Sequence, residues 1–84
     1  MIHKVFTVYD SKAEAYMQPF FSGTTGLAIR SFTEVCNNKE HAFNKYPDDY
    51  TLFEIGTFDD SNGIIEVSQT KKSHGMAIDF VEKL

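Results

Sequence analysis

Along the first ten residues, the apolar positions are mostly β-branched or aromatic, and one side of an extended chain would be more apolar than the other. Residues Ile2–Asp10 are rich in β-branched and aromatic types, which predicts a strand. The side of this strand expected to face the core carries Ile2, Lys4, Phe6 and Val8. The next segment, 11–21, has no helical or two-residue period, and Pro19 blocks helix continuation. We therefore expect an irregular arm after the first strand.

A three- and four-residue spacing of apolar side chains then predicts an amphipathic helix over residues 24–38. Its apolar side carries Ala28, Ile29, Phe32, Val35 and Cys36. Thr24 or Thr25 can cap the first turn, and the two asparagines at the end of this segment are a suitable stop. Residues 39–50 contain a Pro-Asp turn and are expected to form a loop.

Two more strands are predicted, over Tyr50–Phe58 and Ile64–Thr70. The connection between them ends in Asn62 and Gly63, which are expected to supply the positive φ angles of a tight hairpin. Ser73 is expected to cap a C-terminal helix. The apolar stripe of that helix would consist of Ala77, Phe80, Val81 and Leu84.

The predicted elements follow the order β-α-β-β-α, and a chain of 84 residues is expected to form a single domain, 1–84. This order favours an α+β fold with a three-stranded, mostly antiparallel sheet and the helices packed on one face. The connection between the first two strands is expected to be a right-handed crossover. Such a fold is ferredoxin-like without its last strand.

The composition adds a question about the sheet, because the chain has eight Phe and four Tyr but no Trp. The second strand carries Phe53 and Ile55 on one side, and a second apolar set, Tyr50, Leu52 and Phe58, on the other. Two short helices can cover only one side. The other side is either a platform on which bases stack or an apolar interface, for example in a homodimer. The same alternatives hold for Phe20 and Phe21 in the arm.

The net charge of −4 and the pI near 5.2 argue against the uniformly basic face of a typical duplex-DNA binder. A local basic patch remains compatible with this charge, if the sheet edge gathers Lys4, Lys71 and Lys72. The Ser-Gly-Thr-Thr run before the first helix either receives a phosphate or simply caps that helix. Arg30 lies near this helix start and is either a phosphate contact or a solvated side chain.

We find no pattern that predicts an active site. Cys36 falls on the apolar side of the helix and is expected to be a structural thiol rather than a nucleophile paired with His41. The three histidines lack metal-ligand spacing, so we expect no metal site. Because no active-site pattern is present, we also expect no enzymatic activity, cofactor or small-molecule substrate. A single cysteine excludes an internal disulfide and favours a reducing cytoplasm. We expect neither a signal peptide nor a membrane span.

Several motifs, in order, resemble one known family: VYDSKAEAYMQPFF, then AIRSF, then KYPDDYTLFEIGTFDDSNG. They are similar to the small non-structural protein of Chlamydia-type microviruses, the gokushoviruses, which are single-stranded DNA bacteriophages. The resemblance covers nearly the whole chain. The positions that match are Tyr9, Asp10, Ser11, Lys12, Pro19, Phe20, Phe21, Ile29, Arg30, Phe32, Pro47, Leu52, Phe53 and Gly56.

This resemblance implies a DNA-binding protein that acts in genome replication in the host cytoplasm, around the switch to single-strand production. We therefore expect a non-enzymatic homodimer that binds single-stranded DNA, with affinity that falls steeply as salt rises. The residues expected to meet phosphates are Lys12 and Arg30, assisted by Lys4, Lys71 and Lys72. Those expected to stack on bases are Tyr9, Phe20, Phe21 and Tyr50. The alternative is a protein–protein interaction module that regulates replication or assembly without touching DNA.

Overall fold

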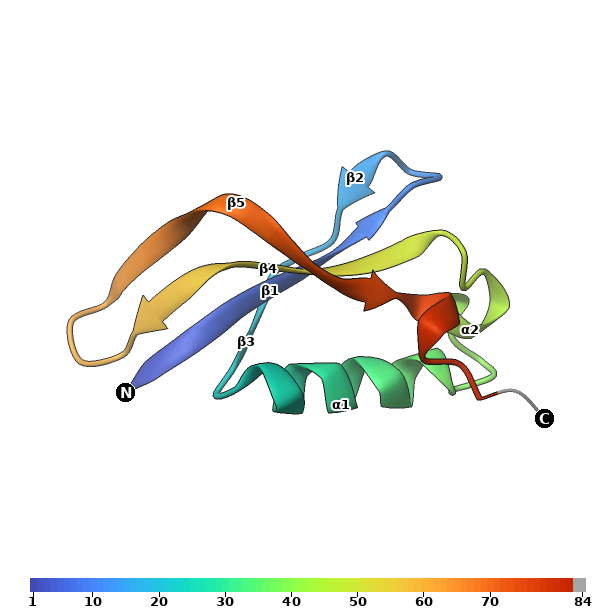
Figure 1. Cartoon of the computed structure of the whole chain (residues 1–84), viewed down its shortest axis with the longest axis horizontal. Helices are drawn as coiled ribbons and strands as arrows, with labels where there is room; N and C mark the ends of the chain where they lie inside the picture. The colour runs from blue at the N-terminus through green and yellow to red at the C-terminus, as the bar shows by residue number, and fades with distance from the viewer. Residues whose placement is uncertain (83–84) are drawn as a thin grey trace.

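Three long strands form the centre of an antiparallel sheet. The computed structural model describes residues 1–82, in which β1 (Ile2–Asp10) pairs with β4 (Tyr50–Asp59) and β4 pairs with β5 (Ile64–Met76). The α+β class and the first two predicted strands are confirmed. The third predicted strand is longer than expected, because it continues for six residues past Thr70. Figure 1 shows the sheet as strongly twisted, with α1 below it.

The expected irregular arm is wrong, because this segment pairs with the free edge of β1. Two short strands, β2 (Ala15–Tyr16) and β3 (Phe20–Ser22), run antiparallel to β1 along that edge. They are separated at Pro19, which has no N–H group to donate to a ladder. The sheet therefore has five strands and not three, in the order β2-β1-β4-β5 with β3 also on β1.

The pairing of β2 and β3 with β1 also changes how the strands are connected. Because β3 brings the chain back before the helix starts, β1 and β4 are antiparallel neighbours. The predicted right-handed crossover, which applies to parallel strands, is therefore wrong for this chain. The ferredoxin-like comparison fails for the same reason.

The first helix forms where it was predicted. Helix α1 (Thr25–Cys36) begins at Thr24, whose side-chain oxygen accepts a hydrogen bond from the Leu27 amide at 3.1 Å. The predicted loop contains one extra helical turn, α2 (Ala42–Lys45), capped by the His41 side chain. Apart from this turn, the loop prediction stands.

The predicted C-terminal helix is wrong in extent. As far as residue 82, only a single 3₁₀ turn, η1 (Ala77–Asp79), follows β5, and Ser73 lies within β5 instead of capping a helix. Gly75, at a φ of 124°, carries β5 on to pair with Leu52 of β4. The expected stripe residue Leu84 lies outside the described residues.

A β-bulge in β4 decides which aromatic side chains face the helices. Val5 of β1 lies opposite Gly56 of β4, but the next β1 residue, Phe6, lies opposite Glu54. Ile55 therefore has no partner on β1. Because side chains alternate along a strand, one extra residue reverses the side on which the following residues lie. Phe58 therefore shares a side with Phe53, which contradicts the prediction that placed it on the same side as Tyr50 and Leu52.

The core lies between α1, α2, η1 and one face of the sheet. Its buried apolar members are Phe6, Val8, Ala28, Phe32, Cys36, Phe43, Tyr50, Leu52 and Ala77. The helices thus pack on one face, as predicted. Of the four β1 residues expected to face the core, two belong to it, whereas Ile2 is exposed and Lys4 is only partly buried near the start of α1.

The hairpin between β4 and β5 uses one of the two expected positive φ angles. Gly63 has a φ of 76°, whereas Asn62 is not in the left-handed region. The Asn62 side chain instead accepts a hydrogen bond from the Ile64 amide at 2.9 Å. A side-chain acceptor that holds the turn in this way is typical of asparagine.

Candidate functional site

The sheet face opposite α1 carries a group of aromatic side chains that no helix in residues 1–82 covers. At the end nearer the β1–β2 turn, the Tyr9 and Tyr16 rings lie 4.7 Å apart between centroids. Phe53 of β4 meets Tyr16 edge-on at 6.0 Å. The Lys71 ammonium of β5 lies 5.4 Å from the centre of the Tyr16 ring, within reach of a cation–π interaction.

A second aromatic pair occupies the other end of the same face. The Phe21 and Phe58 rings lie 5.3 Å apart, and His3 lies beside Phe58 with a centroid distance of 6.2 Å. Phe21 is 53% exposed and Tyr16 is 47% exposed, although each contacts another ring. We call Tyr9, Tyr16, Phe21, Phe53 and Phe58 together the aromatic face.

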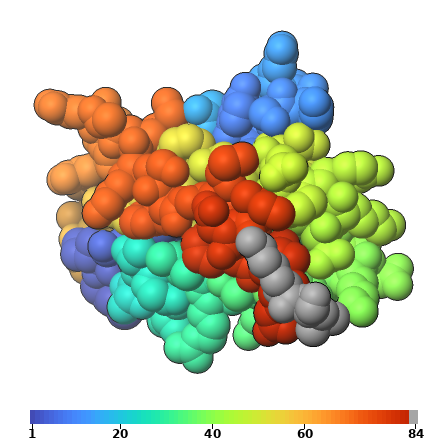
Figure 2. All heavy atoms as spheres, turned by 45° about the vertical axis from the view of Figure 1, so that its right-hand side comes forward, coloured from blue at the N-terminus to red at the C-terminus, as the bar shows by residue number. Residues whose placement is uncertain are grey.

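The strands that border the aromatic face give it a trough-like shape. Between the pairs Glu54–Lys72 and Gly56–Val67, β5 advances five residues (72 − 67) while β4 advances two (56 − 54). The additional residues of β5 bow away from β4 and arch over the sheet (Figure 1). Figure 2 shows this part of β5, in orange, and the residues around the β1–β2 turn, in blue, rising on either side of a lower strip.

The predicted binding residues are divided between several places. Three of them, Tyr9, Phe21 and Lys71, lie on the aromatic face. Lys72 is exposed on β5, and Lys12 is exposed in the β1–β2 turn.

The other predicted residues lie on the helix side. Phe20 stacks on Phe6 at 5.7 Å and packs against the core, and Tyr50 is buried in the core. Burial, with a smaller effect from nearby carboxylates, raises the pKa of the Tyr50 phenol. Arg30 is exposed on α1. These side chains, together with Lys4, cannot reach a ligand on the aromatic face.

Three residues of the aromatic face were not among the predicted binding residues. Phe58 was assigned to the other side of its strand because the bulge at Ile55 has no sequence signature. Tyr16 was placed in an arm of undefined direction. Phe53 was recognised as half of an apolar strand face, but its neighbours on that face were unknown.

Lys4 takes part in a partly buried polar cluster at the start of α1. Its ammonium donates to Thr25 Oγ1 at 3.0 Å, and Thr25 Oγ1 donates to Glu54 Oε1 at 3.3 Å. His74 Nε2 lies 3.0 Å from the same carboxylate oxygen, with the His74 side chain 11% exposed and that of Glu54 18% exposed. This cluster links β1, α1, β4 and β5. Within it, the Lys4 ammonium, which was predicted to contact phosphate, is already bound to Thr25 and lies near Glu54.

The cluster also favours ionised Glu54. Burial opposes ionisation, but the hydrogen bond from His74, the Lys4 charge and the bond from Thr25 outweigh it and lower the pKa of Glu54. A carboxylate whose folded-state pKa is lowered stabilises the protein above its unfolded-state pKa. This contribution is lost as the pH falls through the folded-state pKa.

We therefore expect Glu54→Gln to reduce the free energy of unfolding at pH 7 by about 1–2 kcal/mol, because His74 and Lys4 lose a charged partner. The difference should shrink as the pH falls below the ordinary pKa of a glutamate and on through the lowered pKa of Glu54. Urea unfolding at several pH values measures both. A deficit that stays the same from pH 7 to the most acidic pH at which the fold persists would contradict the role of the charge.

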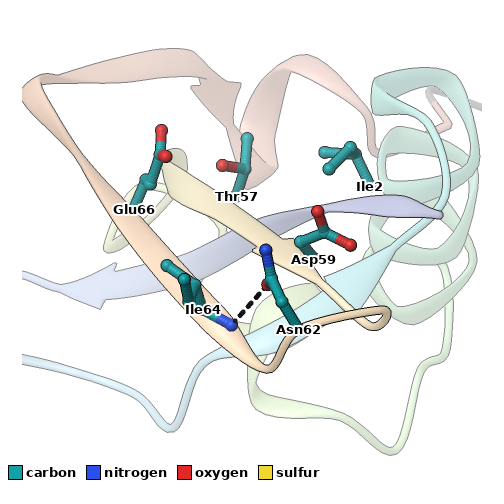
Figure 3. A pocket seen from close by; sticks show the side chains of 6 residues that line it. All are labelled: Ile2, Thr57, Asp59, Asn62, Ile64 and Glu66. Atoms are coloured by element: carbon teal, nitrogen blue, oxygen red, sulfur yellow. Dashed lines mark hydrogen bonds between the residues drawn. The ribbon is translucent and has the colours of Figure 1, made fainter.

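A polar hollow near the β4–β5 hairpin lies on the helix side of the sheet, beyond the start of α1. Its lining residues are Ile2, Thr57, Asp59, Asn62, Ile64 and Glu66 (Figure 3). Two of its polar side chains are already engaged by the turn, since Asp59 accepts from Ser61 and Asn62 accepts from the Ile64 amide. These hydrogen bonds from Ser61 lower the pKa of Asp59. The hollow is thus part of the hairpin structure.

Other chemistry has little support in residues 1–82. Burial raises the pKa of the Cys36 thiol to about 11, and the side chain is fully enclosed, as expected for a structural thiol. No three His, Cys, Asp or Glu side chains in this part of the chain are grouped to hold a metal ion. None of its helices has the length and apolarity needed to cross a membrane.

The chain was compared with protein families, curated proteins and solved structures. Residues 3–80 match the model of the family described as Phage ORF5 protein. No curated protein and no solved structure matches the chain. The matched range includes every residue of the aromatic face.

Proposed function

Because this chain belongs to the Phage ORF5 protein family and is a phage protein, we propose that it binds single-stranded DNA through its aromatic face. It acts without catalysis, in the host cytoplasm, in genome replication or in the switch to single-strand production. The resemblance to gokushovirus proteins supports this assignment, because the genomes of those phages are single-stranded DNA.

The observation that carries the proposal is a group of five aromatic rings on one side of the sheet, of which Tyr16 and Phe21 are exposed and the other three half-buried. Every base has a π-face, so stacking on such rings gives affinity without sequence preference. The rings form two groups, Tyr9, Tyr16 and Phe53 at one end and Phe21 and Phe58 at the other. Two separated groups can hold bases at two places along one strand.

The charge around this face predicts how binding depends on salt. Two exposed lysines lie near it: Lys71 lies over the Tyr16 ring, and Lys12 lies in the β1–β2 turn at one end. Lys72, opposite Glu54, points to the helix side of the sheet. Each phosphate contact to a single strand contributes about −0.7 to the slope of log affinity against log salt, so two contacts give a slope of about −1.4. This is shallower than the steep dependence expected from the sequence, because Lys4 and Arg30 point elsewhere.

Fluorescence anisotropy with a labelled oligothymidine measures this slope directly. We expect affinity to fall about 25-fold between 20 and 200 mM salt. The same oligonucleotide annealed to its complement should bind more weakly, because its bases are already stacked. Absence of binding to the single strand at 20 mM salt would reject the proposed function.

A second candidate function is a protein–protein interaction module that regulates replication or assembly. It is favoured by the apolar β4–β5 hairpin, where Ile64 and Ile65 are exposed and Val67 is 82% exposed. Exposed apolar side chains of this kind are typical of interfaces. Capture of a phage or host protein by a chain that does not bind oligonucleotides would support this function over the first.

A further inference from the structure

The outer edge of β5 is the longest strand edge without a partner in residues 1–82. The sheet order ends at β5, so its outer backbone N–H and C=O groups face solvent. Four of its residues, 68–71, also have no opposite residue on β4, where only Ile55 lies in the corresponding stretch. All residues from Ser61 to Ser73 are exposed. This backbone can form a ladder with another strand.

We propose that β5 pairs edge to edge with β5 of a second copy of this chain, antiparallel and centred on Gln69. This dimer uses the edge of the sheet, whereas the proposed DNA contact uses its face. The two proposals are therefore independent.

The two-fold symmetry of such a dimer restricts its register. Opposite residues of an antiparallel pair point to the same side of the sheet, and residues on one side of a strand are an even number of positions apart. When two identical strands pair, the two residue numbers brought opposite each other must therefore differ by an even number. A centre at Gln69 places Glu66 opposite Lys72 of the other copy, and the same pair occurs twice. Both side chains lie on the helix side, since Glu66 is opposite Thr57 and Lys72 is opposite Glu54.

The neighbouring symmetric registers lack this complementarity. A centre at Ser68 places Glu66 opposite Thr70 and leaves Ile64 opposite Lys72. A centre at Thr70 places Glu66 opposite His74. The register at Gln69 also sets Ser68 against Thr70, a pair of hydroxyl side chains that favours cross-strand hydrogen bonds.

The lysines of β5 have an alternative explanation, because lysine and bulges often protect an edge strand from pairing. In this chain, however, each Lys72 meets a Glu66 of opposite charge in one register only. Exposed Ile65 and Val67 also add apolar area at the same edge. The charges therefore select a register instead of preventing association.

The dimer has a consequence for the aromatic face. A two-fold axis perpendicular to the sheet places both aromatic faces on the same side of a continuous sheet. A single strand of DNA could then cross from one copy to the other. Doubling the number of linked binding places would increase apparent affinity without new contacts.

Sedimentation equilibrium of the full chain, from micromolar to several hundred micromolar, tests this dimer. We expect Glu66→Lys and Lys72→Glu each to raise the dimer dissociation constant at least tenfold, because each sets like charges opposite one another twice. The double variant, Glu66→Lys with Lys72→Glu, should restore it. Gln69→Pro, which removes one N–H from the edge, should give a monomer with unchanged circular dichroism.

A wild-type chain that remains monomeric over this range would overturn the dimer, as would a dimer that the single reversals do not weaken. Failure of the double variant to restore association, with its fold intact, would overturn the register. A monomer that still binds oligonucleotides leaves the proposed function standing. A dimer that binds none rejects that function and keeps the interface.

Discussion

Gly56→Ala is expected to destabilise the fold by about 3 kcal/mol or more. Gly56 is buried at the place where the β4 register shifts against both neighbours. A Cβ atom there would lie 2.3 Å from the Glu66 carbonyl oxygen and 3.3 Å from Val67 Cα. Both are backbone atoms, so β4 and β5 would have to separate. A domain of this size has a total stability of roughly 5–10 kcal/mol, so much of it would be lost.

The same chemical change in α1 supplies the control. A Cβ on Gly26 would have its nearest neighbour at 3.9 Å, which is ordinary van der Waals contact. Gly26→Ala should therefore be neutral or stabilising by up to about 1 kcal/mol, since alanine favours a helix. Urea or thermal unfolding of both variants measures the difference. Wild-type stability of Gly56→Ala would show that β4 and β5 do not approach as closely as described.

The second large effect concerns nucleic acid. Loss of a base-stacking ring costs about 1–3 kcal/mol in binding, so Tyr16→Ala with Phe21→Ala should weaken oligothymidine binding by about 30-fold or more. These two residues are the most exposed members of the aromatic face and come from its two ends. Removing both therefore affects each end of the trough. Fluorescence anisotropy at low salt measures the change.

Tyr46→Ala is the matched control for this variant. Tyr46 is 60% exposed, but it follows α2 at the C-terminal end of that helix and does not belong to the aromatic face. Its loss should leave oligonucleotide affinity within about twofold of wild type. Circular dichroism should confirm that all variants are folded. Equal weakening by Tyr46→Ala, or unchanged binding by the double variant, would place the contact elsewhere on the molecule.

The elements that sequence predicted well are those whose signals are local. The apolar spacing of α1 and the capping side chain of Thr24 both lie within one helix, and the structure confirms them. The β-branched and aromatic residues that predicted β1 also lie within one strand. Gly63 adopts the expected positive φ because its turn is formed by adjacent residues.

The elements that sequence missed depend on distant partners. Residues 15–22 become strands because the edge of β1 is free to pair with them, although their own pattern has no period. β5 continues beyond Thr70 because β4 offers partners as far as Thr51, so the expected helix does not start at Ser73. No local signal identifies either pairing.

The distinction between local signals and distant partners also explains which residues of the candidate site were predicted. Tyr9, Phe21 and Lys71 were predicted as binding residues, and they lie on the aromatic face. Tyr50 and Phe20 were also predicted, but they pack in the core, because strand register decides which ring faces the helices. The prediction that the helices cannot cover all the aromatic surface agrees with the fold.

The most direct test of base stacking on the aromatic face is a nuclear magnetic resonance titration of the labelled chain with oligothymidine. The account predicts that ring signals of Tyr9, Tyr16, Phe21, Phe53 and Phe58 shift together, while those of Tyr46 and the α1 amides stay in place. Shifts confined to α1, or no shifts at a saturating oligonucleotide concentration, would contradict it.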